Sequence, residues 1–249
     1  WFRRAEDLYV SVDMNTDSAA QPLGTSLTNA ALNASLWVDY IYLDTDERRR
    51  FAQVSHEYLI EQLQYTGEET LTGTQEKIRL NFNHPCKELV WVVQRDSYVS
   101  CDDSVINPWK GQQPFNFSDW WDRCVLESGY SVTRVEGMAG KNPTITALLQ
   151  LNGHDRFSAR NGRYFNLVQP YQHHTNTPAI GINVYSFGLK PEEHQPSGTL
   201  NMSRIDTAVL NLSLSGSYAS DSGHNLSVFA VNYNVLRIMS GMGGIAYSN

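Results

Sequence analysis

The feature that most restricts the fold is a set of short segments in which apolar and polar side chains alternate. In Ile78–Phe82, three apolar residues alternate with Arg79 and Asn81, and this period of two predicts a β-strand with one buried face. Glu88–Gln94 contains a more continuous apolar run, typical of a strand covered on both faces. Asn83-His84-Pro85 lies between them and favours a turn, so we predict that the two strands form a hairpin.

Further strand-like segments follow along the chain, with glycine- and proline-rich connections between them. They are Thr144–Leu151, Gly181–Leu189, Leu200–Leu214 and Leu226–Met239. Two long loops, residues 95–143 and 152–178, interrupt the series, and the second is predicted to contain a helical turn near Tyr164–Val168. Many short strands with such turns indicate an antiparallel sandwich or barrel. About eight strands with long loops at one end suit a jelly roll.

The segment Leu36–Gln64 is predicted to connect two β-units. Leu36–Leu43 has the aromatic and β-branched content of a strand. Asp44 followed by Glu47 is the pattern of a helix N-terminus, and the three arginines that come next place positive charge where the helix dipole favours it. His56–Gln64 is apolar again, and its periodicity alone fits either a continued helix or a new strand.

Composition excludes some classes of function. The 249 residues carry a formal net charge of −7, which argues against nonspecific binding to nucleic acid. No apolar run approaches the roughly 18 residues of a membrane helix. Cys86, Cys101 and Cys124 are odd in number and lack paired CxxC spacing, so we expect free thiols in a reducing compartment.

No pattern of residues predicts catalysis, a cofactor or a metal. The acidic pairs are adjacent in sequence and near turns, so we interpret them as solvated charge, and nothing places two carboxylates across a cleft as a glycosidase requires. The pairs are Asp102-Asp103, Glu68-Glu69 and Glu192-Glu193. The histidine clusters lack the spacing of a structural zinc site. They are His84-Pro85-Cys86, His154-Asp155 and His173-His174, of which the last is expected to donate to backbone carbonyls. Gly241–Gly244 is interpreted as a flexible turn after the last strand, because no phosphate-binding lysine follows it.

Aromatic residues in the two long loops are the candidate binding residues. We predict that they contact neighbouring subunits, because aromatic side chains are enriched at protein interfaces. The candidates are Trp109, Phe115, Trp120 and Trp121 in the first loop, with Tyr171 and His173 in the second. The alternative is a carbohydrate-binding module in which Trp109, Trp120 and Trp121 stack on sugar rings.

Five stretches of the sequence, in this order, resemble the major capsid proteins of nucleocytoplasmic large DNA viruses, in particular the phycodnavirus and mimivirus-like proteins. They are LWVDYIYLDTDERRRFAQVSHEYLIEQLQ (36–64), IRLNFNHPCKELVWVVQ (78–94), LNGHDRFSARNGRYFNLVQPYQHHT (151–175), GINVYSFGLKPEEHQPSGTLNMSRIDTAVL (181–210) and VNYNVLRIMSGMGGIAYSN (231–249). The resemblance covers residues 36–249, and it is weakest over 95–143.

The resemblance implies an all-β protein with two jelly rolls. Residues 1–43 would be the closing strands of an N-terminal jelly roll, 44–55 a helical linker, and 56–249 the C-terminal jelly roll. It also implies that the helix ends near Gln53 and that the first strand of the second jelly roll runs through Tyr58–Gln64. Residues 1–35 are too few to bury a core of their own, and half a jelly roll would expose its sheet edges and core, so we expect the natural polypeptide to be longer.

The family also implies a structural rather than an enzymatic role. Three chains would form a pseudo-hexagonal capsomer, and capsomers would tile an icosahedral shell. The expected partners are the chain itself, neighbouring capsomers and minor capsid or cement proteins, without direct nucleic-acid contact or a membrane span, though with an internal membrane beneath the shell. The expected location is the virion, after assembly in the host cytoplasm.

Overall fold

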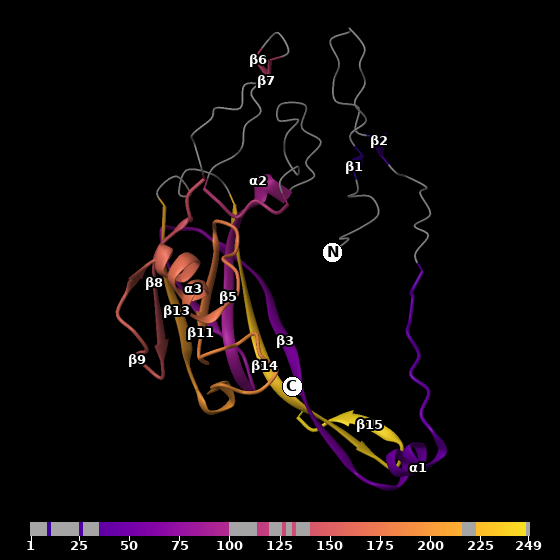
Figure 1. The fold of residues 1–249 in the computed structure, drawn as a ribbon. Helices are drawn as coiled ribbons and strands as arrows, with labels where there is room; N and C mark the ends of the chain where they lie inside the picture. Colours follow the sequence, from indigo (N-terminus) through magenta and orange to yellow (C-terminus); the bar gives the residue numbers. More distant parts are fainter. Residues whose placement is uncertain are drawn as a thin grey trace.

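Two antiparallel β-sheets packed face to face form the body of the molecule (Figure 1). The computed structural model describes residues 9–10, 25–26, 35–99, 114–119, 126–127, 131–132, 140–215 and 223–247. Trp109, Trp120 and Trp121 lie outside these ranges, as do Cys101 and Cys124.

Eight strands pair in a nested order. The first strand pairs with the eighth, the second with the seventh, the third with the sixth and the fourth with the fifth. In chain order they are β3 (His56–Leu71), β4 (Gln75–Leu80), β5 (Pro85–Arg95), β8 (Thr144–Leu151), β10 (Arg160–Asn161), β11 (Ile182–Ser186), β13 (Ala208–Leu214) and β14 (His224–Met239). β3 pairs with β14, β4 with β13, β5 with β11 and β8 with β10, all antiparallel. One sheet has the order β3-β14-β5-β11 and the other β4-β13-β8-β10. This arrangement is a jelly roll, so the predicted fold class is confirmed.

Short strands and helices complete the described structure. The strands are β1 (Tyr9–Val10) with β2 (Thr25–Ser26), β6 (Leu126–Glu127) with β7 (Ser131–Val132), β9 (His154–Asp155) beside β8, β12 (Leu200–Asn201) beside β5, and β15 (Met242–Ile245) beside β14. The helices are α1 (Thr45–Gln53), α2 (Asp96–Val99), the π-helix η2 (Tyr164–Val168), α3 (Gln169–His173) and the 3-10 helix η3 (Met202–Arg204). The helical turn predicted near Tyr164–Val168 is therefore confirmed.

Alternating side chains from both sheets fill the space between them. On β5, Leu89, Trp91 and Val93 are at most 1% exposed, whereas the residues between them are half-buried. The Trp91 ring packs against Phe165 of η2 with ring centroids 5.1 Å apart. From the other sheet, Ile78, Leu80 and the buried residues of β13 close the core. The period-two pattern of Ile78–Phe82 thus predicted the buried face of this segment correctly, since its apolar residues are buried and Arg79 and Asn81 are exposed.

The helix start predicted from Asp44 and Glu47 is present. Asp44 is the N-cap of α1, and its Oδ1 accepts a hydrogen bond of 2.8 Å from the backbone N–H of Glu47. The helix ends at Gln53, and β3 begins at His56. The strand alternative for His56–Gln64 is therefore correct, as the family resemblance implied.

The predicted hairpin between Ile78–Phe82 and Glu88–Gln94 is wrong. β4 and β5 belong to different sheets, and the turn between them crosses from one layer to the other. His84 turns the chain with φ +67°, and Gln64 of β3 exchanges two hydrogen bonds, of 2.9 and 3.0 Å, with the backbone of Asn83. Periodicity indicates that a segment is a strand but does not identify the strand with which it pairs. This is why the predicted hairpin was wrong.

The expected strand at Leu36–Leu43 is absent from the described structure. Residues 35–44 have extended, irregular backbone, and their apolar side chains are exposed, with Trp37 at 92% and Tyr42 at 91%. A strand requires a neighbour that accepts and donates backbone hydrogen bonds, and these residues pair with no strand among those described.

Gly241–Gly244, interpreted from the sequence as a flexible turn, is mostly strand. The turn itself is Ser240-Gly241, with φ +52° and +78°, the two positive values of a two-residue type I′ hairpin. Met242–Ile245 then pairs with the end of β14. Strand formation here depends on backbone hydrogen bonds, which the glycine-rich sequence does not reveal.

Candidate assembly surfaces

A β-bulge in β5 turns two consecutive charged side chains toward the outer face of its sheet. β14 pairs Val231 with Glu88 and the next residue, Asn232, with Cys86, so that Lys87 is the additional residue. A bulge breaks the alternation of side chains between the faces. Cys86 therefore remains in the core, while Lys87 and Glu88 both reach groups outside it.

Lys87 is a buried cation with a specific set of partners. The residue is 2% exposed, and its Nζ donates to Oε1 of Glu61 at 2.6 Å. The same Nζ lies 3.3 Å from the backbone oxygen of Glu193 and 5.0 Å from the centroid of the Tyr233 ring. A buried ammonium needs such partners because of the cost of removing it from water. Lys87 therefore fixes the loop after β11 against β3 and β14.

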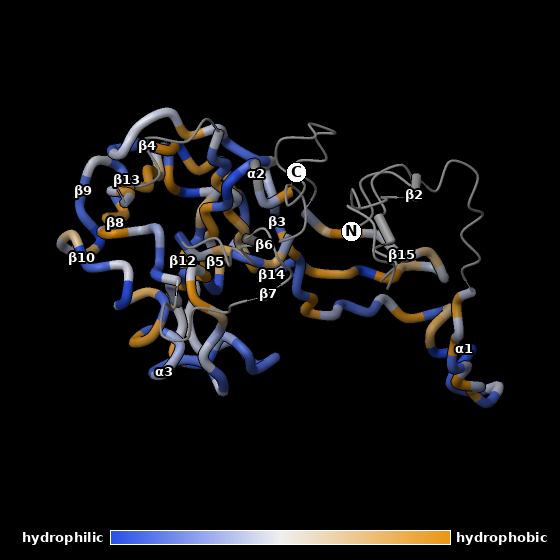
Figure 2. Tube along the Cα trace, turned by 90° about the horizontal axis from the view of Figure 1, so that it is seen from above, coloured by the Kyte–Doolittle hydropathy of each residue, from blue (hydrophilic) through white to orange (hydrophobic). Residues whose placement is uncertain are grey.

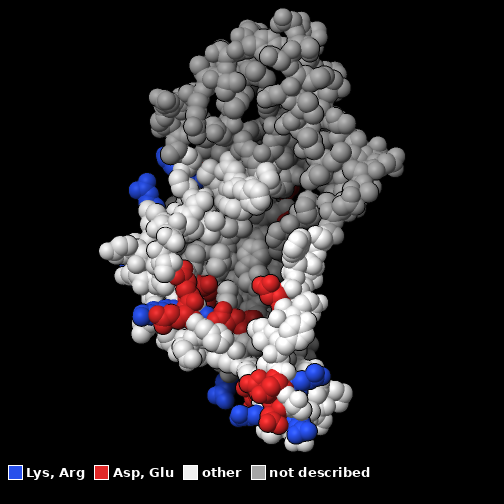
Figure 3. Space-filling view, turned by 45° about the vertical axis from the view of Figure 1, so that its right-hand side comes forward, with Lys and Arg blue, Asp and Glu red and all other residues white. Residues whose placement is uncertain are grey.

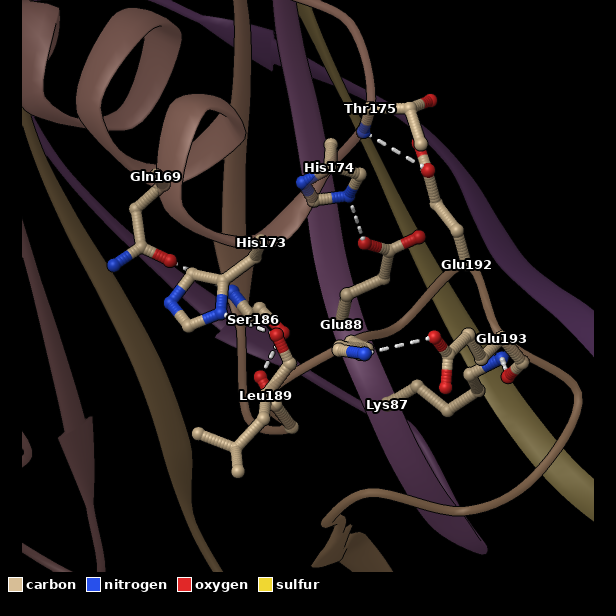
Figure 4. A network of polar contacts seen from close by, with 12 residues as sticks. Lys87, Glu88, Gln169, His173, His174, Thr175, Ser186, Leu189, Glu192 and Glu193 are labelled. Atoms are coloured by element: carbon tan, nitrogen blue, oxygen red, sulfur yellow. Dashed lines mark hydrogen bonds and ion pairs between the residues drawn. The ribbon is translucent and has the colours of Figure 1, made fainter.

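Glu88 holds the end of α3 on the sheet (Figure 4). Its Oε2 lies 2.7 Å from Nε2 of His174, and both side chains are about nine-tenths buried, at 14% and 13% exposure. Beside this pair, Nδ1 of His173 contacts the backbone oxygen of Leu189 at 2.9 Å, and Glu192 accepts a hydrogen bond of 2.9 Å from the backbone N–H of Thr175. The prediction that His173-His174 contacts backbone carbonyls is thus correct for His173 and wrong for His174, which contacts the carboxylate of Glu88 instead.

Buried amides fix the connection from β10 to β11. Asn166 of η2 donates to the backbone oxygens of Ala179 and Ile182, at 3.0 and 2.8 Å. Gln169 accepts from the backbone N–H of Ser186 at 3.1 Å. A satisfied buried network of this kind gives a loop one conformation. The loop therefore presents its exposed side chains at fixed positions.

Phe115 and Tyr171, two of the loop residues predicted to contact neighbouring subunits, face outward. Tyr171 on α3 is 86% exposed and Phe115 is 85% exposed, while His173 is half-buried. Phe115 is held near the end of β5, because Gln94 donates to the backbone oxygen of the preceding Pro114 at 2.8 Å. No contact brings Phe115 and Tyr171 together in the described structure. The role of these residues in subunit contact stays a prediction, and that of Trp109, Trp120 and Trp121 lies outside the described residues.

Sequence reasoning missed two features, the polar cluster around Lys87 and a projecting three-stranded extension. The sequence pattern that could have indicated the polar cluster is a lysine followed by a glutamate, Lys87-Glu88, at the start of an apolar strand. The extension, which we call the arm, consists of residues 56–63 of β3, 232–239 of β14, and β15, with α1 at its tip (Figure 1). Acidic and basic side chains gather side by side at the end of the molecule that α1 occupies (Figure 3). They include Arg49, 3.5 Å from Asp46, and Arg237, 2.7 Å from Glu57.

The described residues contain neither a candidate metal site nor a candidate membrane-spanning helix. No group of three or more His, Cys, Asp or Glu side chains in these ranges could hold a metal ion. Among the helices that the structure describes, none is long and apolar enough to cross a bilayer.

The thiol of Cys86 is expected to be unreactive in the folded protein. Burial raises the pKa of Cys86 from 9.0 to about 12, so the nucleophilic thiolate is scarce at pH 8. We expect iodoacetamide at pH 8 to label Cys86 slowly in the folded chain and quickly in urea, as measured by mass spectrometry of the peptide. Equal rates in both states would contradict this. Because burial disfavours the thiolate, the folded state is favoured only while the thiol is protonated: this contribution to stability is fully present below pH 9 and is lost as the pH rises toward about 12.

The fold and its surfaces define a jelly-roll protein with fixed outward loops, and comparison with known proteins identifies the family. The sequence matches the family described as large eukaryotic DNA virus major capsid protein over residues 47–244. It is 48% identical to the major capsid protein of Phaeocystis pouchetii virus over 93% of this chain and 57% of that protein. It is 43% identical to that of Paramecium bursaria Chlorella virus 1, over 86% of this chain and 54% of the relative.

A solved structure agrees with these sequence relatives. A chain of the PBCV-1 virus capsid superimposes with a TM-score of 0.63 at 39% identity, over 84% of this chain and 56% of that one. The chain described here belongs to the major capsid protein family of large eukaryotic DNA viruses. It spans little more than half the length of these relatives. The comparisons give the carbohydrate-binding alternative no support.

Proposed function

We propose that this chain is the shell-forming part of a major capsid protein, and that it has a structural role without catalysis. The observation that carries the proposal is the complete nested jelly roll in a chain 48% identical to a viral major capsid protein. Capsid subunits need rigid bodies and variable outer loops, and the jelly roll supplies both. The proposed location is the virion, with assembly in the host cytoplasm.

We propose further that three copies form a pseudo-hexagonal capsomer and that capsomers tile an icosahedral shell. In this arrangement residues 1–43 belong to a preceding jelly roll, residues 44–55 are the linker, and 56–249 form the second jelly roll. The exposed apolar side chains of Leu36–Leu43 support the first assignment, because they need a surface to cover them. Minor capsid or cement proteins would join neighbouring capsomers.

Electron microscopy of the purified complete polypeptide tests the proposal. Negative staining is expected to show trimers with a pseudo-hexagonal outline, and light scattering is expected to give a mass of three chains. A protein that remains monomeric at concentrations well above micromolar would reject the proposed assembly. Metal- or substrate-dependent turnover in the same preparation would reject a purely structural role.

A further inference from the structure

Three consecutive arginines lie on the helix at the tip of the arm. Arg48, Arg49 and Arg50 occupy the middle of α1, and every residue of this helix is exposed. Figures 1 and 2 show α1 at the end of the arm, away from the sandwich. The guanidinium groups are therefore accessible to an acidic pocket of the kind that trypsin uses for its specificity.

The exposure of α1 follows from its own composition. The sequence of the helix is TDERRRFAQ, in which only Phe51 and Ala52 are apolar. A helix that is polar all round has no face to bury against another element. Phe51 itself lies against the ring of His56, the first residue of β3, with ring centroids 4.8 Å apart. We therefore expect the arginines to remain accessible in a longer polypeptide.

Cleavage also requires that the helix open, because a protease binds the segment that it cuts in an extended conformation. α1 has nine residues, and isolated helices shorter than roughly 12–15 residues are marginal in water. Its start is stabilised by the N-cap bond of 2.8 Å from the backbone N–H of Glu47 to Asp44. No residue of α1 is buried, so opening removes little apolar packing. Segments with few buried contacts open at a low free energy.

Three exposed arginines of the sandwich lie in segments that are attached to the core. They are Arg156, Arg160 and Arg163. Arg156 is followed by Phe157, whose ring packs on that of Phe165 with centroids 5.5 Å apart. Arg163 is followed by η2, which contains the buried Phe165. Opening of these segments breaks contacts in the core, whereas opening of α1 does not.

We propose that α1 is a site at which an arginine-directed endoprotease cleaves the folded protein. Water adds across the peptide bond, so that the arginine carbonyl becomes a carboxylate and the nitrogen of the next residue becomes a free amine. The bonds after Arg49 and Arg50 are favoured over the bond after Arg48. Asp46 and Glu47 lie directly before Arg48, and their charges repel an acidic pocket. This inference goes beyond the proposed capsid role and does not depend on it.

Cleavage at α1 leaves the C-terminal jelly roll complete. All eight nested strands follow the cut, because β3 begins at His56. The cut therefore breaks the covalent connection to the preceding part of the polypeptide without removing a strand from either sheet of the sandwich. We expect the cleaved chain to keep its far-ultraviolet circular dichroism spectrum.

Limited digestion of the complete polypeptide with trypsin at neutral pH tests the proposal. Mass spectrometry is expected to show new N-termini at Arg50 and Phe51. These should form at least about tenfold faster than cuts after the three exposed arginines of the sandwich, because the opening of α1 costs less free energy. Equal or faster cleavage at the sandwich arginines would overturn the proposal.

Two variants of the N-cap test whether opening of α1 controls the rate. Asp44→Ala removes the oxygen that accepts from Glu47, and we expect cleavage to be about fivefold faster. Asp44→Asn removes the same charge but keeps an accepting oxygen, so its rate should stay close to that of the unmodified protein. Equal rates for the two variants would overturn the proposal.

A third variant tests the role of the arginines themselves. The combined substitution Arg48→Gln, Arg49→Gln and Arg50→Gln keeps good helix formers in α1 and is expected to abolish cleavage within the helix. Cuts after the sandwich arginines are expected to continue at their former rates. Circular dichroism before digestion confirms that each variant is folded. Continued cleavage within α1 of this variant would show that recognition does not depend on arginine.

Discussion

Replacement of Trp91 by alanine is expected to lower the free energy of unfolding by about 3–5 kcal/mol. Trp91 is 1% exposed and lies between the two sheets, where it packs on Phe165 of η2. The substitution leaves a large cavity and removes the contact that joins η2 to β5. Since typical domains are stable by about 5–15 kcal/mol, much of the protein would unfold under mild conditions. Urea titration followed by far-ultraviolet circular dichroism measures the loss.

Two control variants distinguish the loss of stability caused by the cavity from other effects of the substitution. Trp91→Phe keeps an aromatic ring against Phe165 and removes the indole Nε1, which has no hydrogen-bond partner among the described residues. We expect this variant to lose about 1–2 kcal/mol. Leu63→Ala, at a site that is 59% exposed, is expected to change stability by about 0.5 kcal/mol or less. A loss below about 1 kcal/mol for Trp91→Ala would show that the core does not depend on this residue.

Removal of Glu61 is expected to destabilise the protein more than removal of its partner Lys87. Glu61→Ala leaves the ammonium of Lys87, 2% exposed, with the backbone oxygen of Glu193 and the face of the Tyr233 ring. Breaking a fully buried pair in this way costs about 3–5 kcal/mol. Because the Glu61 side chain is 36% exposed, water screens the pair, and we expect a loss of about 2 kcal/mol.

Lys87→Met is the matched variant. It keeps a long apolar stem under Tyr233 and leaves Glu61 as a carboxylate that water can reach. The expected loss is about 1 kcal/mol or less, because no buried charge is left without a partner. Chemical denaturation of both variants under the same conditions measures the difference. A larger loss for Lys87→Met than for Glu61→Ala would show that packing of the lysine, rather than the charge pair, determines the stability of this region.

The elements that the sequence predicted well are those with strong local signals. Asp44 and Glu47 marked the start of α1, because capping involves residues three positions apart. The alternation in Ile78–Phe82 gave the buried face of β4, because strand geometry fixes that period. The end of α1 at Gln53 was not decided by periodicity, and the family resemblance supplied it. Local chemistry therefore predicted the type of these elements.

The parts that failed depend on contacts between distant residues. The hairpin error arose because β4 pairs with β13, which lies more than a hundred residues further along the chain. Lys87 was missed because its environment depends on a bulge opposite Val231 and on Glu61, neither of which a local pattern reveals. The arm was missed because it depends on the register of β14 against β3 and β15. Strand partners and bulges are properties of the whole sheet.

The nested pairing also determines when the chain can fold during synthesis. β14 lies between β3 and β5 in its sheet, yet it is the last of the eight nested strands to be made. β3 must therefore wait for a partner about 170 residues away, which at 5–20 residues per second is roughly 10–30 seconds of translation. Such distant pairing makes folding slow. A ribosome that stops before residue 224 releases a polypeptide whose sheet lacks its central strand, so we expect prematurely terminated chains to fail to fold.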